Sequence, residues 1–259
     1  MRDPDKDTRS AGFTLIEVMI GLVIAMLVIG VATSFYQHTI RENLKIKDSA
    51  MLQQSAFFTA YIANQHLRQA GYKGIDASMI NGRLMPIPAN DDIFPEVTGE
   101  WEQGQFIRVA NNTIGIRFNG SSDISGVADG SIIDCSGNPV AAGTIQDVAL
   151  QLTGDQLICT SGGVAETLLG GDNLAVSTMI INLGIDDEAD GSIDRYEDPA
   201  SISTDDLALV REVLIRLLMV SNRNLDATGR SYRFNNTDIV YTDDQYRREV
   251  VIRTALRNQ

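Results

Sequence analysis

The chain has 259 residues, of which 44% are hydrophobic and 21% are charged, which is enough for one sizeable core and excludes a disordered or polytopic membrane protein. Thirty-four acidic residues against 21 Lys and Arg residues give a formal net charge of -13, the wrong sign for neutralising phosphates, so no nucleic-acid partner is expected. The chain has two histidines and contains no phosphate-binding, zinc-protease or serine-hydrolase motif, so we do not expect an enzyme.

A long apolar segment follows the first twelve residues. No Asp, Glu, Lys or Arg occurs between Glu17 and Arg41, and a helix from Val18 to Tyr36 would be about 28 Å long, close to the thickness of a bilayer's hydrocarbon core. The sequence therefore predicts one membrane span in residues 13–36. The bases of the first dozen residues favour a cytoplasmic amino terminus, so the rest of the chain is expected to be exported.

A conventional signal peptide, cut near Val31, is the alternative for this segment. Glu17 argues against it, because an unpaired charge inside an apolar helix costs about 2–3 kcal/mol on insertion scales. A cut between Gly12 and Phe13 would instead create an amino group within one helical turn of Glu17, in the same chain or in a neighbour. The carboxylate would then have a partner.

The amino-terminal residues carry a family resemblance. The run Gly12-Phe13-Thr14-Leu15-Ile16-Glu17, followed by an uninterrupted apolar helix, resembles the processing site of type IV prepilins and of the pseudopilins of type II secretion. The resemblance implies that prepilin peptidase removes residues 1–12 as a leader and that the amine of Phe13 is methylated. It also implies that Glu17 pairs with the Phe13 amine of a neighbouring subunit, and that the helix lies in the inner membrane before it enters the filament.

An amphipathic helical pattern continues through residues 37–70. We expect the helix to end near residue 69, because no proline interrupts the pattern and Gly71 suits a helix terminus. His38 and His66 are interpreted as ordinary helix residues. The expected apolar positions recur every three or four residues: Ile40, Leu44, Met51, Leu52, Ser55, Phe58, Ile62 and Leu67.

Residues 71–259 are predicted to form one β-rich globular domain. Glycine, asparagine and proline separate short apolar runs at residues 105–109, 113–118 and 148–152, which read as strands. Residues 211–220 and 249–256 are richer in aliphatic side chains and are expected to be central strands of an antiparallel sheet. A long helix packed on such a sheet gives an α+β fold.

Two cysteines, Cys135 and Cys159, lie at the edges of predicted strands. In an exported domain a pair of cysteines favours a disulfide over free thiols or a metal site. A bridge across this loop would stabilise the fold by about 3 kcal/mol in the entropy model. The alternative is two buried cysteines that behave as small hydrophobic residues.

Acidic residues are concentrated between Asp186 and Asp206, where nine acids accompany one base, Arg195. The spacing from Asp186 to Glu197 fits a twelve-residue calcium loop. The alternative is a solvated acidic turn, because Glu188 is longer than the usual third ligand and no flanking helices are predicted. The expected calcium ligands are oxygens of Asp186, Glu188, Asp190, Ser192, Asp194 and Glu197.

Several short internal motifs are similar to the PilW family of minor pilins. This resemblance implies a type IV pilin fold and a minor pilin that, with other minor pilins and the major pilin, primes pilus assembly near the filament tip. Its domain would be periplasmic and later part of the surface filament. Residues 85–101 depart from the family pattern. The motifs are Arg68-Gln69-Ala70-Gly71-Tyr72, Asp134-Cys135-Ser136-Gly137, Leu157-Ile158-Cys159, Leu183-Gly184-Ile185-Asp186 with Asp190-Gly191-Ser192-Ile193-Asp194-Arg195-Tyr196, and Leu256-Arg257-Asn258.

Two other functions stay open at this point. A type II secretion pseudopilin shares the same amino-terminal chemistry. A membrane-anchored, calcium-dependent adhesin would use the acidic loop to shape a binding surface.

Overall fold

The structure is a computed structural model that describes residues 14–80, 83–86, 94–123, 125–171, 174–203, 205–221, 231–243 and 245–256. Contacts divide the chain into two compact units, one ending at Lys47 and the other beginning at Asp48. Gly12 and Phe13, the expected processing residues, lie outside the described part.

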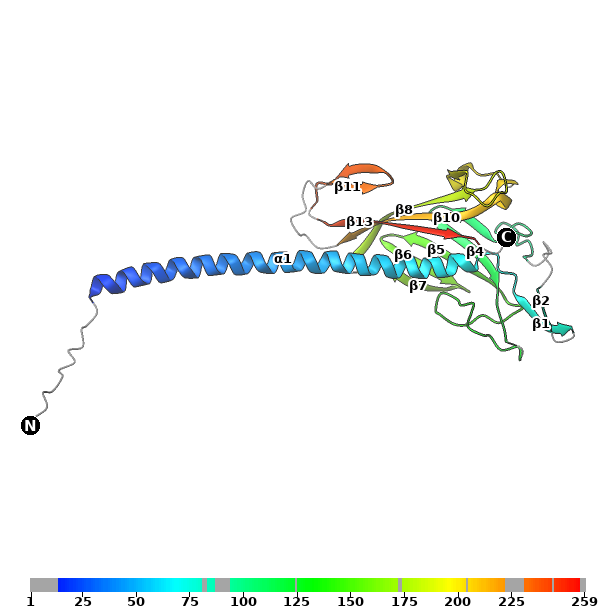
Figure 1. The fold of residues 1–259 in the computed structure, drawn as a ribbon, viewed down its shortest axis with the longest axis horizontal. Coiled ribbons are helices and arrows are strands. Elements are labelled where there is room, and N and C mark those ends of the chain that lie inside the picture. The colour runs from blue at the N-terminus through cyan, green and yellow to red at the C-terminus, as the bar shows by residue number, and fades with distance from the viewer. Residues whose placement is uncertain are drawn as a thin grey trace, which may run out of the picture. The chain divides into compact units, whose positions relative to one another are not determined.

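The helix α1 extends from Leu15 to Gln69 (Figure 1). No proline interrupts it, and its end agrees with the predicted end near residue 69. Gly71 follows with a φ of 72°, in the left-handed region that glycine adopts at low cost. Its N–H donates to the carbonyl of Arg117 at 2.9 Å, which joins the end of the helix to a strand of the β domain.

The β domain is built from two larger antiparallel sheets instead of the single sheet that we predicted. One sheet has the strand order β3-β4-β5-β6-β7 and the other has the order β13-β10-β8-β9. The strands of the first are β3 (Ile107–Ala110), β4 (Thr113–Asn119), β5 (Ile145–Thr153), β6 (Gln156–Ser161) and β7 (Val164–Leu169). Those of the second are β8 (Leu174–Ile185), β9 (Arg195–Glu197), β10 (Val210–Ser221) and β13 (Arg247–Ala255).

Two hairpins and two short 3₁₀ turns complete the described elements. The hairpins pair β1 with β2 and β11 with β12. Their bounds are Ile75–Ile80, Arg83–Pro86, Ser231–Phe234 and Thr237–Val240, and the turns η2 and η3 comprise Pro199–Ser201 and Asp205–Leu209.

Of the two strands that were predicted to be central, one is central and the other lies at an edge of its sheet. β10 is central, paired with β8 on one side and β13 on the other, and its run of aliphatic residues is buried on both faces. β13 is an edge strand of this sheet. Its buried residues Val250, Ile252 and Thr254 alternate with exposed ones, as expected for a strand with one covered face.

The core of the β domain joins the carboxyl-terminal part of α1 to both sheets. Leu52, Ala56, Ala63 and Leu67 of the helix belong to one cluster of buried residues. In β4 the cluster includes Ile114, Ile116 and Phe118, which alternate along the strand. The residues between them, Gly115 and Arg117, therefore belong to the opposite face of the sheet.

Candidate functional site

The apolar amino-terminal part of α1 is the first candidate site. Its large hydrophobic side chains from Leu15 to Tyr36 are each between 52% and 82% exposed. The segment is long and apolar enough to cross a membrane by length and composition. An apolar surface of this length is not stabilised by its own unit of the chain, so it requires a bilayer or other apolar helices around it.

Glu17 lies in the first turn of this segment. Its N–H donates to the carbonyl of Thr14 at 3.1 Å and faces the Thr14 hydroxyl at 3.4 Å, so Thr14 begins the helix. The hydroxyls of Thr33 and Thr39 donate to carbonyls one turn earlier, which satisfies them within the helix. Among the described residues, no ion pair forms with Glu17.

The carboxyl-terminal part of α1 is fixed to the β domain by polar contacts as well as by the core. The carboxylate of the buried Asp48 accepts a hydrogen bond from the hydroxyl of Ser221 at 3.1 Å. Farther along the helix, the hydroxyl of Thr254 in β13 donates to the side-chain oxygen of Asn64. Both ends of this helical segment are therefore held against the second sheet.

The buried face of this segment differs from the predicted one at Phe58. Phe57, Phe58 and Tyr61 are 67%, 56% and 68% exposed. The helix instead turns the small residues Ala56 and Ala63 toward the cluster, because small side chains let a helix approach a sheet closely. The spacing of apolar residues predicted the helix correctly, but Phe58, one of the expected apolar positions, lies on the exposed face.

Cys135 and Cys159 form a disulfide, with their Cα atoms 5.7 Å apart. Cys159 lies inside β6 and not at its edge as predicted. Cys135 lies in a turn, where the carboxylate of Asp134 accepts from the backbone N–H groups of Ser136 and Asn138. The bridge therefore attaches this turn to the middle of a strand.

The acidic loop that follows β8 is organised by hydrogen bonds to its own backbone. Asp186, 1% exposed, accepts from the N–H groups of Asp190 and Gly191 at 3.1 and 2.9 Å. Asp194 accepts from the N–H of Asp187 at 2.8 Å. The N–H of Ser192 donates to Asp190 and lowers the pKa of that carboxyl group.

Two arginines lie against the carboxylates of this loop. Arg195 pairs with Asp187 and lies 3.3 Å from Glu197 and 4.0 Å from Asp206. Arg211 lies 3.8 Å from Asp186. Over the described ranges no group of three or more His, Cys, Asp or Glu side chains converges as a metal site. Calcium binding by Asp186, Glu188, Asp190, Ser192, Asp194 and Glu197 stays a prediction.

The structure also brings together a polar cluster that the sequence analysis did not single out. Arg117, whose side chain is 3% exposed, donates to Asp147 at 2.9 Å and to the Pro95 carbonyl at 2.8 Å. Its guanidinium lies 5.1 Å from the centroid of the Trp101 ring and 6.0 Å from that of Phe94. Burial raises the pKa of Asp147, and the charge of Arg117 opposes this rise.

A solved structure with a similar fold places this architecture among known ones. A type IV-like pilin from Thermus thermophilus matches with a TM-score of 0.51 and 12% identity, over 80% of this chain and 96% of that chain. At this identity the match concerns the fold alone. The long helix packed on antiparallel sheets is thus a type IV pilin-like fold.

Two family models match separate segments of the chain. Residues 7–33 match the prokaryotic N-terminal methylation motif, and residues 144–258 match type IV pilus-assembly protein W. The first match contains the predicted processing residues and Glu17, and the second contains Cys159 and the acidic loop. No curated protein is significantly similar in sequence. The chain is therefore similar to prepilins at its amino terminus and to type IV pilus-assembly protein W over residues 144–258.

Proposed function

We propose that this protein is a minor pilin that takes part in the assembly of a type IV pilus. The observation that carries the proposal is Glu17, an acidic residue at the start of the exposed apolar segment of α1, inside the methylation motif. A carboxylate in such a helix is costly unless it has a partner. The match of residues 144–258 to type IV pilus-assembly protein W supports the same function from the other end of the chain.

The proposed maturation begins with cleavage between Gly12 and Phe13 by prepilin peptidase, followed by methylation of the Phe13 amine. The new amine is a cation that can pair with Glu17 of a neighbouring subunit. This pairing offsets a cost of about 2–3 kcal/mol for a lone carboxylate in apolar surroundings. The same interaction would set the axial position of one helix against the next.

The proposed location follows from the helix. Before assembly the chain is held in the inner membrane by residues 13–36, with its β domain in the periplasm. It then joins other minor pilins in a complex that primes the filament, and it stays near the tip with the major pilin below it. The exposed apolar side chains of α1 would exchange lipid for the helices of these partners.

The test compares two substitutions in the same helix. Glu17→Gln removes the charge with little change in shape, and Glu42→Gln removes a charge beyond the apolar segment. We expect Glu17→Gln to leave processing intact and to lower incorporation into sheared filaments at least tenfold, while Glu42→Gln stays within twofold of wild type. Mass spectrometry of the mature amino terminus and immunoblots of filaments measure the two effects.

Normal incorporation of the Glu17→Gln protein would contradict the proposed pairing. An amino terminus that is uncut, or cut beyond the apolar helix, would contradict the proposed maturation. Gold-labelled antibodies against the β domain test the location separately, because a tip subunit is labelled at filament ends and a shaft subunit along the whole length.

A pseudopilin of type II secretion is the nearest rival. Deletion of the gene distinguishes the two functions: loss of surface pili with normal secretion supports the pilus, and loss of secretion with normal pili supports the rival. The match to type IV pilus-assembly protein W favours the pilus.

A further inference from the structure

The outer face of the five-stranded sheet contains a hollow created by two small residues. The strand pairing places Arg108, Gly115, Ala149 and Thr160 side by side in one row across β3, β4, β5 and β6. The two central members of the row have no side chain beyond Cβ. The neighbouring row on β4 and β5 pairs Thr113 with Gln151, so larger side chains border the low row.

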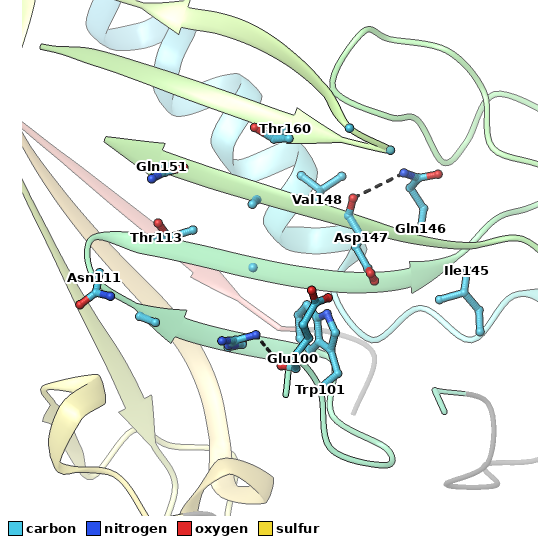
Figure 2. A pocket seen from close by; sticks show the side chains of 16 residues that line it. Glu100, Trp101, Asn111, Thr113, Ile145, Gln146, Asp147, Val148, Gln151 and Thr160 are labelled. Carbon is cyan, nitrogen blue, oxygen red and sulfur yellow. Dashed lines mark hydrogen bonds between the residues drawn. The ribbon is translucent and has the colours of Figure 1, made fainter. Parts of the chain in front are cut away.

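This hollow has a volume of about 880 Å³ and is open to solvent. Volumes of this order are typical of small-molecule sites. Trp101 forms part of its wall, together with Glu100 and Asp147, and Thr113 and Gln151 lie away from these residues along the strands (Figure 2).

Gly115 allows Trp101 to lie close to the sheet. A Cβ atom added there would lie 3.3 Å from the edge of the Trp101 ring. The absence of a side chain thus lets the indole approach the sheet beside the hollow. Because Trp101 is 7% exposed, it acts as a rigid wall, held by the guanidinium of Arg117.

Neutral polar side chains line the hollow together with apolar and charged ones. Hydroxyl and amide groups both donate and accept hydrogen bonds. They come from several strands and turns, so they surround the hollow instead of forming a single line. These side chains are Asn111, Thr113, Gln146, Gln151 and Thr160.

The charged groups at the hollow are largely engaged with each other or with the backbone. Asp147 accepts from Arg117 at 2.9 Å, and Arg108 donates to the Glu100 carbonyl at 2.6 Å. Arg108 is the one cationic side chain among the lining residues, and two carboxylates oppose it. This balance does not select a phosphate or another anion, and the hydroxyl and amide side chains favour a ligand that forms hydrogen bonds over a purely apolar one.

We propose that this hollow binds a neutral saccharide. A sugar presents many hydroxyl groups of both hydrogen-bonding senses without net charge, which matches the amide, hydroxyl and carboxylate groups of the lining. The small side chain of Ala149, next to the indole that lies over Gly115, leaves room for a sugar ring to lie against the sheet. The site lies in the β domain and uses neither Glu17 nor the apolar helix, so it is independent of the proposed assembly function.

The test uses Trp101 as its own reporter, because it is the one tryptophan in the sequence. Full-length protein is kept in a zwitterionic detergent without a sugar headgroup and titrated with cellotetraose or with chitotetraose. Cellotetraose represents neutral glucans, and chitotetraose represents the N-acetylated sugars of cell-wall and surface glycans. We expect a saturable change in tryptophan emission with at least one of them, and none with glycerol at the same concentration.

Two leucine substitutions in the same row locate the binding. Ala149→Leu fills the hollow, whereas Ala165→Leu places the same side chain on β7, beside Thr160 but outside the lining. We expect Ala149→Leu to weaken binding at least tenfold and Ala165→Leu to change it less than twofold. Gln151→Ala removes one lining amide without filling the hollow, and we expect it to weaken binding about threefold to tenfold.

Three results would overturn this proposal. The first is no saturable signal with either tetrasaccharide, by fluorescence and by calorimetry. The second is wild-type binding by a folded Ala149→Leu protein, as judged by its melting temperature. The third is tighter binding of tetragalacturonate, an anionic tetrasaccharide, than of both neutral ones. Because assembly does not enter the measurement, a failed Glu17 experiment leaves this result unaffected.

Discussion

The two parts of α1 share one backbone geometry but have opposite surroundings. Leu27 is 66% exposed in the first part and Leu67 is 0% exposed in the second. Both are leucines of the same 55-residue helix. The apolar side chains of the first part are exposed to surroundings outside the chain. Those of the second part pack against the β domain. Hydrophobicity alone therefore does not tell which partner a helical segment has.

The largest expected effect is the difference in stability between two leucine-to-alanine substitutions, one in each part of α1. Leu67→Ala removes a fully buried side chain and should lower the free energy of unfolding of the β domain by about 2–5 kcal/mol. Leu27→Ala should leave that free energy unchanged within about 0.5 kcal/mol, because the residue lies outside the folded core. Chemical denaturation of the detergent-solubilised protein measures both. Equal losses would show that the two parts of α1 are not energetically distinct.

The disulfide is expected to affect the stability of the β domain but not the apolar part of α1. Replacing both Cys135 and Cys159 with serine should lower the free energy of unfolding by about 3 kcal/mol, because the unfolded chain loses a closed loop. Membrane insertion and processing at the amino terminus should not change. The melting temperature of the variant and that of the reduced wild-type protein check this expectation. An unchanged melting temperature in both would contradict a stabilising role for the bridge.

Addition of calcium tests the predicted metal binding by the acidic loop of the β domain. If the predicted loop binds Ca²⁺, a hundredfold excess over the dissociation constant should stabilise the fold by about 2.7 kcal/mol. Asp190→Asn should remove this effect while keeping an oxygen for the Ser192 N–H. Asp238→Asn, a loss of the same charge on β12, is the matched control. The absence of both calcium heat in calorimetry and a shift in melting temperature would remove the prediction.

The smallest expected effect is a pH dependence from His66. Burial lowers the pKa of His66, although the nearby Asp134 opposes this shift. The unfolded chain therefore binds a proton more readily than the folded one, so stability should be complete above about pH 6.5 and should fall as the pH drops below it. Carboxyl groups with a lowered pKa, such as Asp129 and Asp243, contribute only at more acidic pH.

Melting temperatures between pH 8 and pH 5 measure this dependence. His66→Gln should flatten the curve over this range, and His38→Gln, at an exposed position in the same helix, should not. A curve that keeps its slope in the His66→Gln protein would assign the dependence to another group.

Several elements show how much of the structure could be predicted from the sequence. The runs at residues 113–118 and 148–152 correspond to β4 and β5, because their alternation is a local property of the chain. The interpretation of β13 as a central strand was wrong, since its place in the sheet depends on pairing with β10. The burial of Phe58 was also wrong, because the sheet selects the helix face that brings small residues toward it.

The sequence by itself determined a continuous helix, its apolar first half and the isolated acidic residue Glu17. These features follow from neighbouring residues, since helix propensity, hydropathy and motif spacing are local. Only the tertiary structure decided which helix face is buried and that Gly115 and Ala149 meet in one row. Strand register joins residues far apart in the chain, so no local pattern could reveal the hollow beside Trp101.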